Sequence, residues 1–116
     1  MLSLFTRSAV KTVVPRSDVY KSAKEFLLEL EIPGVRKEDV IMESISEKLV
    51  IKAKKSVSTF EEFEKIHSKR NFTPFECEID LPNDVDSERI EGSCINGVLT
   101  VRIPRKTQKS VEIKVQ

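Results

Sequence analysis

From Asp18 onward, apolar and polar residues alternate along the chain with a period of two, which is typical of β-strands with one buried face. The segment Glu25 to Ile32 shows this pattern clearly, and it ends at Pro33-Gly34. Similar alternation continues in five later segments, which cover Val40 to Ile45, Leu49 to Lys54, Phe75 to Leu81, Arg89 to Ile95 and Val98 to Ile103. About seven short strands separated by turns predict an all-β fold, an antiparallel β-sandwich.

Turn residues divide these segments into hairpins. Ser46-Glu47-Lys48 separates the second segment from the third, and Asn96-Gly97 tolerates the positive φ that a two-residue hairpin turn requires. Pro74 suggests a sheet edge or a bulge at the start of its strand. The segment Lys55 to Lys69 is polar and charged and predicts a loop, although Glu61 to Ile66 within it fits a helical turn as well as a short strand.

The N-terminal 17 residues differ from the rest of the chain. They contain basic and hydroxyl side chains and no acid before Asp18, a composition that fits a mobile arm or, alternatively, a mitochondrial presequence. Leu2, Leu4 and Phe5 form a short apolar cluster that is too small for a core but can bind other apolar surfaces reversibly. We therefore expect residues 1–17 to form an arm that contributes to assembly or to client contacts.

The C-terminal end has a second apolar signal. Residues 105–110 lack any apolar anchor and predict a solvated linker. Val111, Ile113 and Val115 then alternate with Glu112 and Lys114. This tethered segment is either the last strand of the chain's own sheet or a strand that docks on another subunit. The predicted organisation is an arm at residues 1–17, one domain at 18–104 and a C-terminal extension at 105–116.

Size and charge narrow the class of protein. The chain has 116 residues and 13.3 kDa, which suffices for one domain. Its 20 basic and 19 acidic residues lack the basic excess usual for nucleic-acid binding, and 34% charged residues do not fit a membrane-spanning chain. We expect neither nucleic acid nor a membrane span.

No residue pattern indicates catalysis, a metal or a cofactor. Cys77 and Cys94 form neither a disulfide framework nor a Cys-x-x-Cys pair, so a reducing compartment is expected. His67, the single histidine, lies beside Ser68 without a third group to orient it. The glycines are isolated, and none belongs to a phosphate-binding loop. We expect no enzyme activity.

Three stretches together resemble the alpha-crystallin domain of small heat-shock proteins. They are FLLELEIPGVRKEDV from Phe26 to Val40, LVIKA from Leu49 to Ala53 and NGVLTV from Asn96 to Val101. Val111-Glu112-Ile113 resembles the short I-x-I/V motif in the tail of the same family. The resemblance implies an immunoglobulin-like β-sandwich that dimerises, assembles into larger homo-oligomers through its arms, and holds unfolding client proteins soluble without ATP.

Alternation would direct six residues of two strands toward a common groove that, by the resemblance, receives Val111 and Ile113. They are Val40, Met42, Ser44, Ile90, Gly92 and Cys94, and the alternative is that all six are ordinary core. The family often has Ala-x-Leu where this chain has Gly92-Ser93-Cys94, and the smaller lining would make the groove roomier or its docking weaker.

The resemblance leaves the dimer mode open. The Lys55 to Lys69 loop is shorter than the strand-exchange loop of plant and bacterial members, while Arg70-Asn71-Phe72 resembles the arginine-containing strand through which animal members pair. Arg70 and Phe72 are therefore candidate dimer contacts. A different class of function also remains open, a CS-domain-like co-chaperone or adaptor that recruits a folded chaperone. We expect a cytoplasmic location, or a mitochondrial one if residues 1–17 are a presequence.

Overall fold

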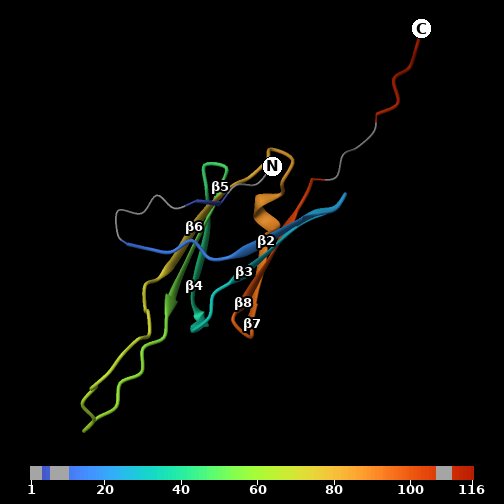
Figure 1. Cartoon of the computed structure of the whole chain (residues 1–116). Coiled ribbons are helices and arrows are strands. Elements are labelled where there is room, and N and C mark those ends of the chain that lie inside the picture. The colour runs from blue at the N-terminus through green and yellow to red at the C-terminus, as the bar shows by residue number, and fades with distance from the viewer. Residues whose placement is uncertain (1–3, 6–10, 107–110) are drawn as a thin grey trace.

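The computed structural model describes residues 4–5, 11–106 and 111–116, and it places two antiparallel four-stranded sheets face to face (Figure 1). The first sheet has the strand order β1-β6-β5-β4, and the second has the order β2-β3-β8-β7. The strands are β1 (Leu4–Phe5), β2 (Ser17–Lys21), β3 (Glu25–Glu31), β4 (Val35–Ile45), β5 (Lys48–Lys55), β6 (Phe75–Asp80), β7 (Glu91–Ile95) and β8 (Val98–Pro104). The predicted all-β sandwich is confirmed.

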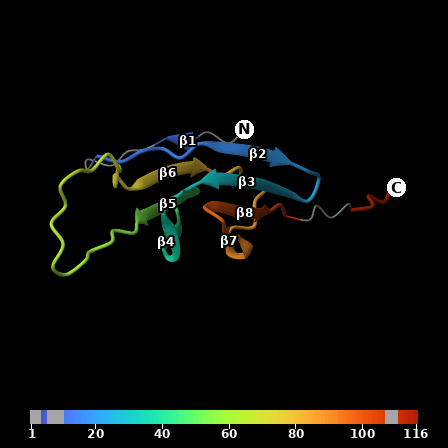
Figure 2. The same cartoon turned by 60° about the horizontal axis from the view of Figure 1, so that its bottom comes forward.

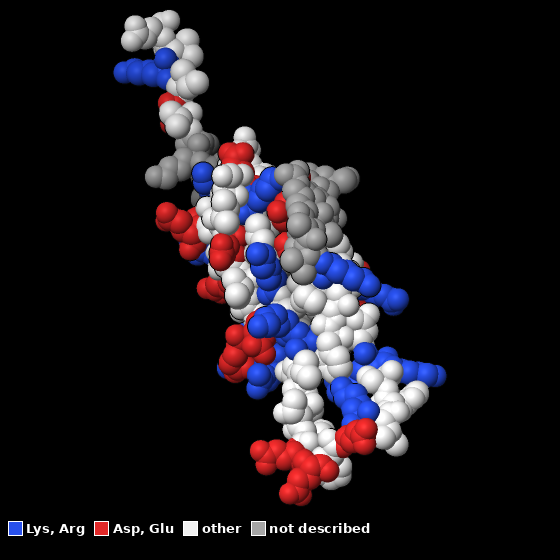
Figure 3. Space-filling view, turned by 90° about the vertical axis from the view of Figure 1, so that its left-hand side faces the viewer, with Lys and Arg blue, Asp and Glu red and all other residues white. Residues whose placement is uncertain are grey.

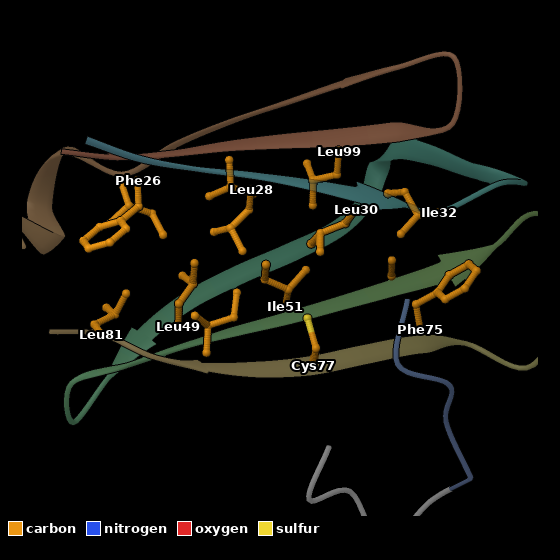
Figure 4. Close-up of a cluster of buried hydrophobic side chains, with 14 of the residues drawn as sticks. Phe26, Leu28, Leu30, Ile32, Leu49, Ile51, Phe75, Cys77, Leu81 and Leu99 are labelled. Atoms are coloured by element: carbon orange, nitrogen blue, oxygen red, sulfur yellow. The ribbon is translucent and has the colours of Figure 1, made fainter. Parts of the chain in front are cut away.

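The core lies between the sheets and follows the period-two pattern of the sequence. Every second side chain of β3, β5, β6 and β8 points inward, because successive side chains of a strand alternate between its faces (Figure 4). Leu28 and Leu30 of β3, Ile79 of β6 and Val101 of β8 are fully buried. The inward residues are Phe26, Leu28, Leu30, Leu49, Ile51, Ala53, Phe75, Cys77, Ile79, Leu99, Val101 and Ile103.

Both predicted hairpins are present. Asn96 and Gly97 have φ values of 52° and 77°, and they join β7 to β8 in the two-residue turn that this pair favours. The β4–β5 turn is also of two residues, because Lys48 already pairs with Ile45. Ser46 and Glu47 adopt φ values of 48° and 64° there, although neither is a glycine.

Two strand boundaries differ from the sequence prediction. A 3₁₀ turn, η1 (Ser87–Arg89), replaces the beginning of the strand expected from Arg89, because the Asp86 side chain accepts a hydrogen bond from the Glu88 amide and caps the turn. β4 begins at Val35, before the expected start, and its pairing with β5 is irregular between Val35 and Val40. The alternation of side chains is weakest at both places.

The segment before β2 crosses from one sheet to the other. Val13 forms a bridge with Phe75 at the start of β6, with hydrogen bonds from the Val13 amide to the Pro74 carbonyl and from the Glu76 amide to the Val13 carbonyl. Pro15 is buried, and the Arg16 carbonyl accepts a hydrogen bond from the Glu31 amide of β3. Residues 11–17 therefore close one long side of the sandwich.

The chain between β5 and β6, residues 56–74, projects from the sandwich as an extended finger (Figures 1 and 2). The described chain forms no helix or strand between these two strands, so the predicted loop is confirmed. A turn closed by a hydrogen bond from the Phe63 amide to the Phe60 carbonyl lies within it. The finger leaves beside Gly34, whose carbonyl accepts a hydrogen bond from the Ser56 amide.

Candidate assembly and client-binding surfaces

The long side opposite residues 11–17 is open. It is bounded by β4, the edge of the first sheet, and β7, the edge of the second sheet, and within the described chain neither strand has a partner on its outer edge. We call this side the seam. Each edge presents unpaired backbone groups, which are the features that allow another strand to add to a sheet.

The six groove residues predicted from the sequence lie along the seam, but they are not equivalent. Four of them are partly buried and pack against the edge of the core, namely Val40, Met42, Ile90 and Cys94. Ser44 and Gly92 are exposed. Ile90 precedes β7 instead of lying within it. The six residues thus lie on the two edge strands or directly before β7, and four of them contact the edge of the core.

Gly92 and Met42 face each other across the seam. A Cβ atom placed on Gly92 would lie 2.7 Å from the Met42 Cε atom and 3.4 Å from its Sδ atom. The space that the missing side chain leaves at residue 92 is thus filled by Met42. The lack of a side chain at Gly92 therefore does not make the seam roomier at this point.

The tail residues expected to dock are available for contact. Val111 and Ile113 are 79% and 82% exposed, and Val115 is 90% exposed. Residues 111–116 form no strand, and Figure 1 draws them apart from both sheets. They are therefore not a strand of this chain's own sheets in the structure.

The finger carries apolar side chains that the sequence analysis did not single out. Phe60, Phe63 and Ile66 are 70%, 80% and 91% exposed. The rings of Phe60 and Phe63 meet edge to face with centroids 6.1 Å apart, beside a hollow of about 850 Å³ within the finger. The spacing of three residues between these apolar side chains could have indicated a shared apolar surface in the sequence. The charged residues between them made the whole segment read as a polar loop.

The candidate dimer contacts Arg70 and Phe72 lie in the returning limb of the finger, outside any strand. The Arg70 guanidinium lies 4.7 Å from the centroid of the Phe72 ring, within the range of a cation–π contact. After Phe72 the chain enters β6, and the outer edge of β6 is already occupied by Val13 and β1. Leu4 and Phe5 of β1 pair there with Ile79 and Glu78. By contrast, the outer edge of β2 is unpaired within the described chain, and all five residues of β2 are exposed.

The arm residues are placed only in part. Leu2 lies outside the described residues, and Leu4 and Phe5 are described as backbone pairs of β6.

Electrostatics do not single out a catalytic site in the described chain. Burial raises the pKa of the Cys77 thiol to about 12, so this thiol is neutral and unreactive in the folded protein. A hydrogen bond from Arg105 lowers the pKa of Asp84, and the Nε–Oδ2 distance of this pair is 2.7 Å. Acidic and basic side chains are interspersed over the face shown in Figure 3, without a field of one sign.

No group of three or more His, Cys, Asp or Glu side chains among the described residues is arranged to hold a metal ion. Within the same part of the chain, no helix has the length and apolar character needed to cross a membrane.

Comparison with known proteins agrees with this geometry. The Small heat shock protein C4 of Rickettsia felis is 35% identical over 107 residues, which cover 90% of this chain and 66% of that protein. Heat shock protein 16 of Schizosaccharomyces pombe is 36% identical over 109 residues, which cover 86% of this chain and 75% of that protein. This chain thus spans about two thirds to three quarters of the length of these relatives.

Solved structures share the fold. Heat shock protein 16.0 from Schizosaccharomyces pombe matches 90% of this chain and 99% of its own with a TM-score of 0.69 and 32% identity. A small heat-shock protein from Xylella fastidiosa, described as having a distinct high order structure, matches 91% of this chain and 99% of its own with a TM-score of 0.74 and 25% identity. The family model described as Hsp20/alpha crystallin matches residues 18–116. The chain belongs to the Hsp20/alpha crystallin family of small heat-shock proteins.

Proposed function

We propose that this protein is an ATP-independent holdase, a chaperone that binds unfolding proteins and prevents their aggregation. The observation that carries the proposal is the open seam of a small heat-shock protein sandwich in a chain that also exposes an apolar tail and an apolar finger. Exposed apolar surfaces of this kind mark interaction sites, and a holdase must keep them covered at rest to avoid aggregating itself. Family membership favours this function over the co-chaperone alternative.

Assembly above the dimer is proposed to use the tail. Val111 and Ile113 of one copy would lie along the seam of another and contact Val40, Ile90 and Cys94. Alternate tail side chains would face the seam, and the tail backbone would pair with an open strand edge. The occupied seam would then be covered at rest and available to clients after the tail leaves.

The dimer is proposed to form through the finger and β2. The finger leaves the sandwich near Ser17, the first residue of β2. At that end the Ser56 amide donates a hydrogen bond to the Gly34 carbonyl, and the Val13 amide donates one to the Pro74 carbonyl. A second copy related by a two-fold axis there could lay its finger along the open β2 edge. Arg70 and Phe72 would contribute from the returning limb, whereas direct pairing of two β6 edges would require Val13 and β1 to leave.

Client binding is assigned to apolar residues outside the core. Leu2, Leu4 and Phe5 of the arm and the exposed Phe60 and Phe63 of the finger are proposed to contact clients in addition to the seam. We propose a cytoplasmic location, because a chain with two cysteines and no disulfide framework fits a reducing compartment. Import and cleavage by isolated mitochondria would establish the presequence alternative instead.

The test is suppression of aggregation without nucleotide. Near-equimolar protein should reduce the light scattering of a heated client, with the same result in the presence and absence of ATP. Light-scattering mass behind size-exclusion chromatography should show a dimer or a larger species. Unchanged client scattering together with tight binding of a folded chaperone would replace the holdase proposal by the co-chaperone function.

A further inference from the structure

The end of the Met42 side chain lies against the backbone of Gly92. Gly34 and Gly97 have φ values of 81° and 77°, which favour glycine, whereas the φ of Gly92 does not lie in this left-handed region. Glycine at position 92 leaves room for the end of the Met42 side chain, since a Cβ there would lie 2.7 Å from the Met42 methyl carbon and this flexible end would have to shift. The contact joins the edge strands of the two sheets.

Met42 occupies the middle of the seam. It lies between Val40 and Ser44 on β4, and Gly92 lies between Ile90 and Cys94 on the opposite side. The side chains of tail residues 111 and 113 are separated by roughly 7 Å in an extended strand, which is also the spacing between successive seam positions of β4. A tail that covers two neighbouring positions of the seam therefore includes the central one. Met42 resting on Gly92 then occupies space that an apolar side chain of the tail requires.

We propose that Met42 is a displaceable plug of the seam, which rests on Gly92 in the free chain and swings away when Val111 and Ile113 of a second copy dock. This inference rests on the tail docking of the proposed function. Methionine suits the role because its unbranched side chain has three rotatable bonds and adapts to irregular spaces. The plug covers the core edge while the seam is empty, and it makes tail docking weaker and more easily reversed.

The plug can be observed directly by NMR. The chain has two methionines, Met1 and Met42, so ¹³C-methyl labelling of methionine gives two signals, which the M42L variant assigns. In the V111A/I113A double variant, the Met42 methyl should show a nuclear Overhauser effect to the Gly92 α-protons. In the assembled full-length wild type, this effect should be lost and the Met42 signal should shift.

Two matched variants of β4 test the consequence for assembly. M42A removes the plug and should strengthen tail-dependent assembly by about tenfold, as expected for a plug that is closed about nine-tenths of the time. V40A removes a seam contact without touching Gly92 and should weaken assembly. Native mass spectrometry across a dilution series measures both effects, and circular dichroism checks the folding of each variant.

The outcomes separate the two proposals. If V111A/I113A keeps the mass of the wild type, tail docking fails and the plug fails with it. If the mass falls but the Met42 methyl keeps its contact with Gly92 in the assembled wild type, only the plug is overturned. A folded M42A variant that assembles as weakly as V40A would also overturn it, because Met42 would then be an ordinary docking contact.

Discussion

The two long sides of the sandwich differ in how the edges of the two sheets are covered. On the side of β6 and β2, residues 11–17 cross between the sheets, with Val13 on β6, Pro15 buried and Arg16 bonded to β3. On the side of β4 and β7, no described part of the chain covers the edges, and Met42 resting on Gly92 spans the gap. Exposed strand edges favour unwanted pairing, so natural sheets protect them.

The difference indicates a division of labour. On the closed side, residues 11–16 cover the core without a partner subunit, so these residues should contribute mainly to the stability of the monomer, whereas the outer edge of β2 stays available for the proposed dimer. The seam has its backbone edges free and its apolar residues half-buried, so it should contribute mainly to assembly. Changes in the core behind residues 11–16 and changes on the seam should therefore separate stability from tail-dependent association.

Each side carries one cysteine, and the largest difference between the two sides is expected in the rate at which these thiols react. Cys77 of β6 is fully buried, and its pKa of about 12 leaves only about one thiolate in ten thousand at pH 8. Cys94 of β7 is half-buried on the seam. A thiol reagent should label Cys94 at least about a thousandfold faster than Cys77, which should react through unfolding.

Mass spectrometry of the labelled peptides measures both rates. Raising the pH above about 9 should also lower the free energy of unfolding, because the unfolded chain then gains a Cys77 thiolate that the folded chain resists up to about pH 12. Equal labelling of the two thiols in folded protein would contradict a closed β6 side.

A pair of substitutions compares the sides by stability. Phe75 of β6 is 8% exposed, so Phe75→Ala should cost about 3–5 kcal/mol of unfolding free energy. Met42→Ala on the seam should cost about 1–2 kcal/mol, because that side chain is only partly buried and its loss is partly relieved by solvent. Urea unfolding of both variants at one protein concentration gives the values, and a larger cost for Met42→Ala would reverse the comparison.

Two truncations test which part of the arm closes the sandwich. Removal of residues 1–10 should lower the melting temperature by only a few degrees, since Val13, Pro15 and Arg16 remain. Removal of residues 1–16 also removes three backbone hydrogen bonds, to Pro74, to Glu76 of β6 and to Glu31 of β3, worth about 1 kcal/mol each. It should lower the melting temperature by roughly 10–20 °C.

Both truncations should reduce assembly and client protection, because both lack Leu2, Leu4 and Phe5. If residues 1–17 are an arm, as their composition indicates, their deletion should leave a folded dimer. Calorimetry of the longer truncation decides whether residues 11–16 act as arm or as part of the sandwich. A wild-type melting temperature would assign them to the arm.

The strands were predictable because their signals are local. The alternation from Phe26 to Ile32 and the Asn96-Gly97 turn each depend on neighbouring residues, and both are confirmed. Alternation also assigns Val40, Met42 and Cys94 to the inner faces of their strands, and all three pack against the edge of the core.

The contacts between distant segments were not predictable in the same way. Val13 meets Phe75, and Met42 meets Gly92, only because the two sheets bring them together. Periodicity assigns a face to each residue but does not identify its partner on the other sheet. The 3₁₀ turn at Ser87–Arg89 was missed because its stabilising cap comes from Asp86, a residue outside the alternating pattern.

Substitutions in the tail should have the smallest effect on the stability of the sandwich and a large effect on the mass of the oligomer. Burial of Val111 and Ile113 in the seam of another copy could contribute on the order of 3 kcal/mol, before the cost of ordering the linker is subtracted. In a closed oligomer each tail is held near a neighbouring seam, so a weak contact can decide the assembly size. V111A/I113A should therefore shift the population toward dimers.

The same double variant should melt within about 2 °C of the wild type when both are compared as dimers, because both side chains are exposed and outside the core. E112Q/K114Q is the matched control, since it changes the neighbouring tail residues and keeps both apolar side chains. It should retain the wild-type mass. If V111A/I113A keeps its mass while its sandwich melts much earlier, the tail belongs to the sheet of its own chain, and the seam must be covered by another segment.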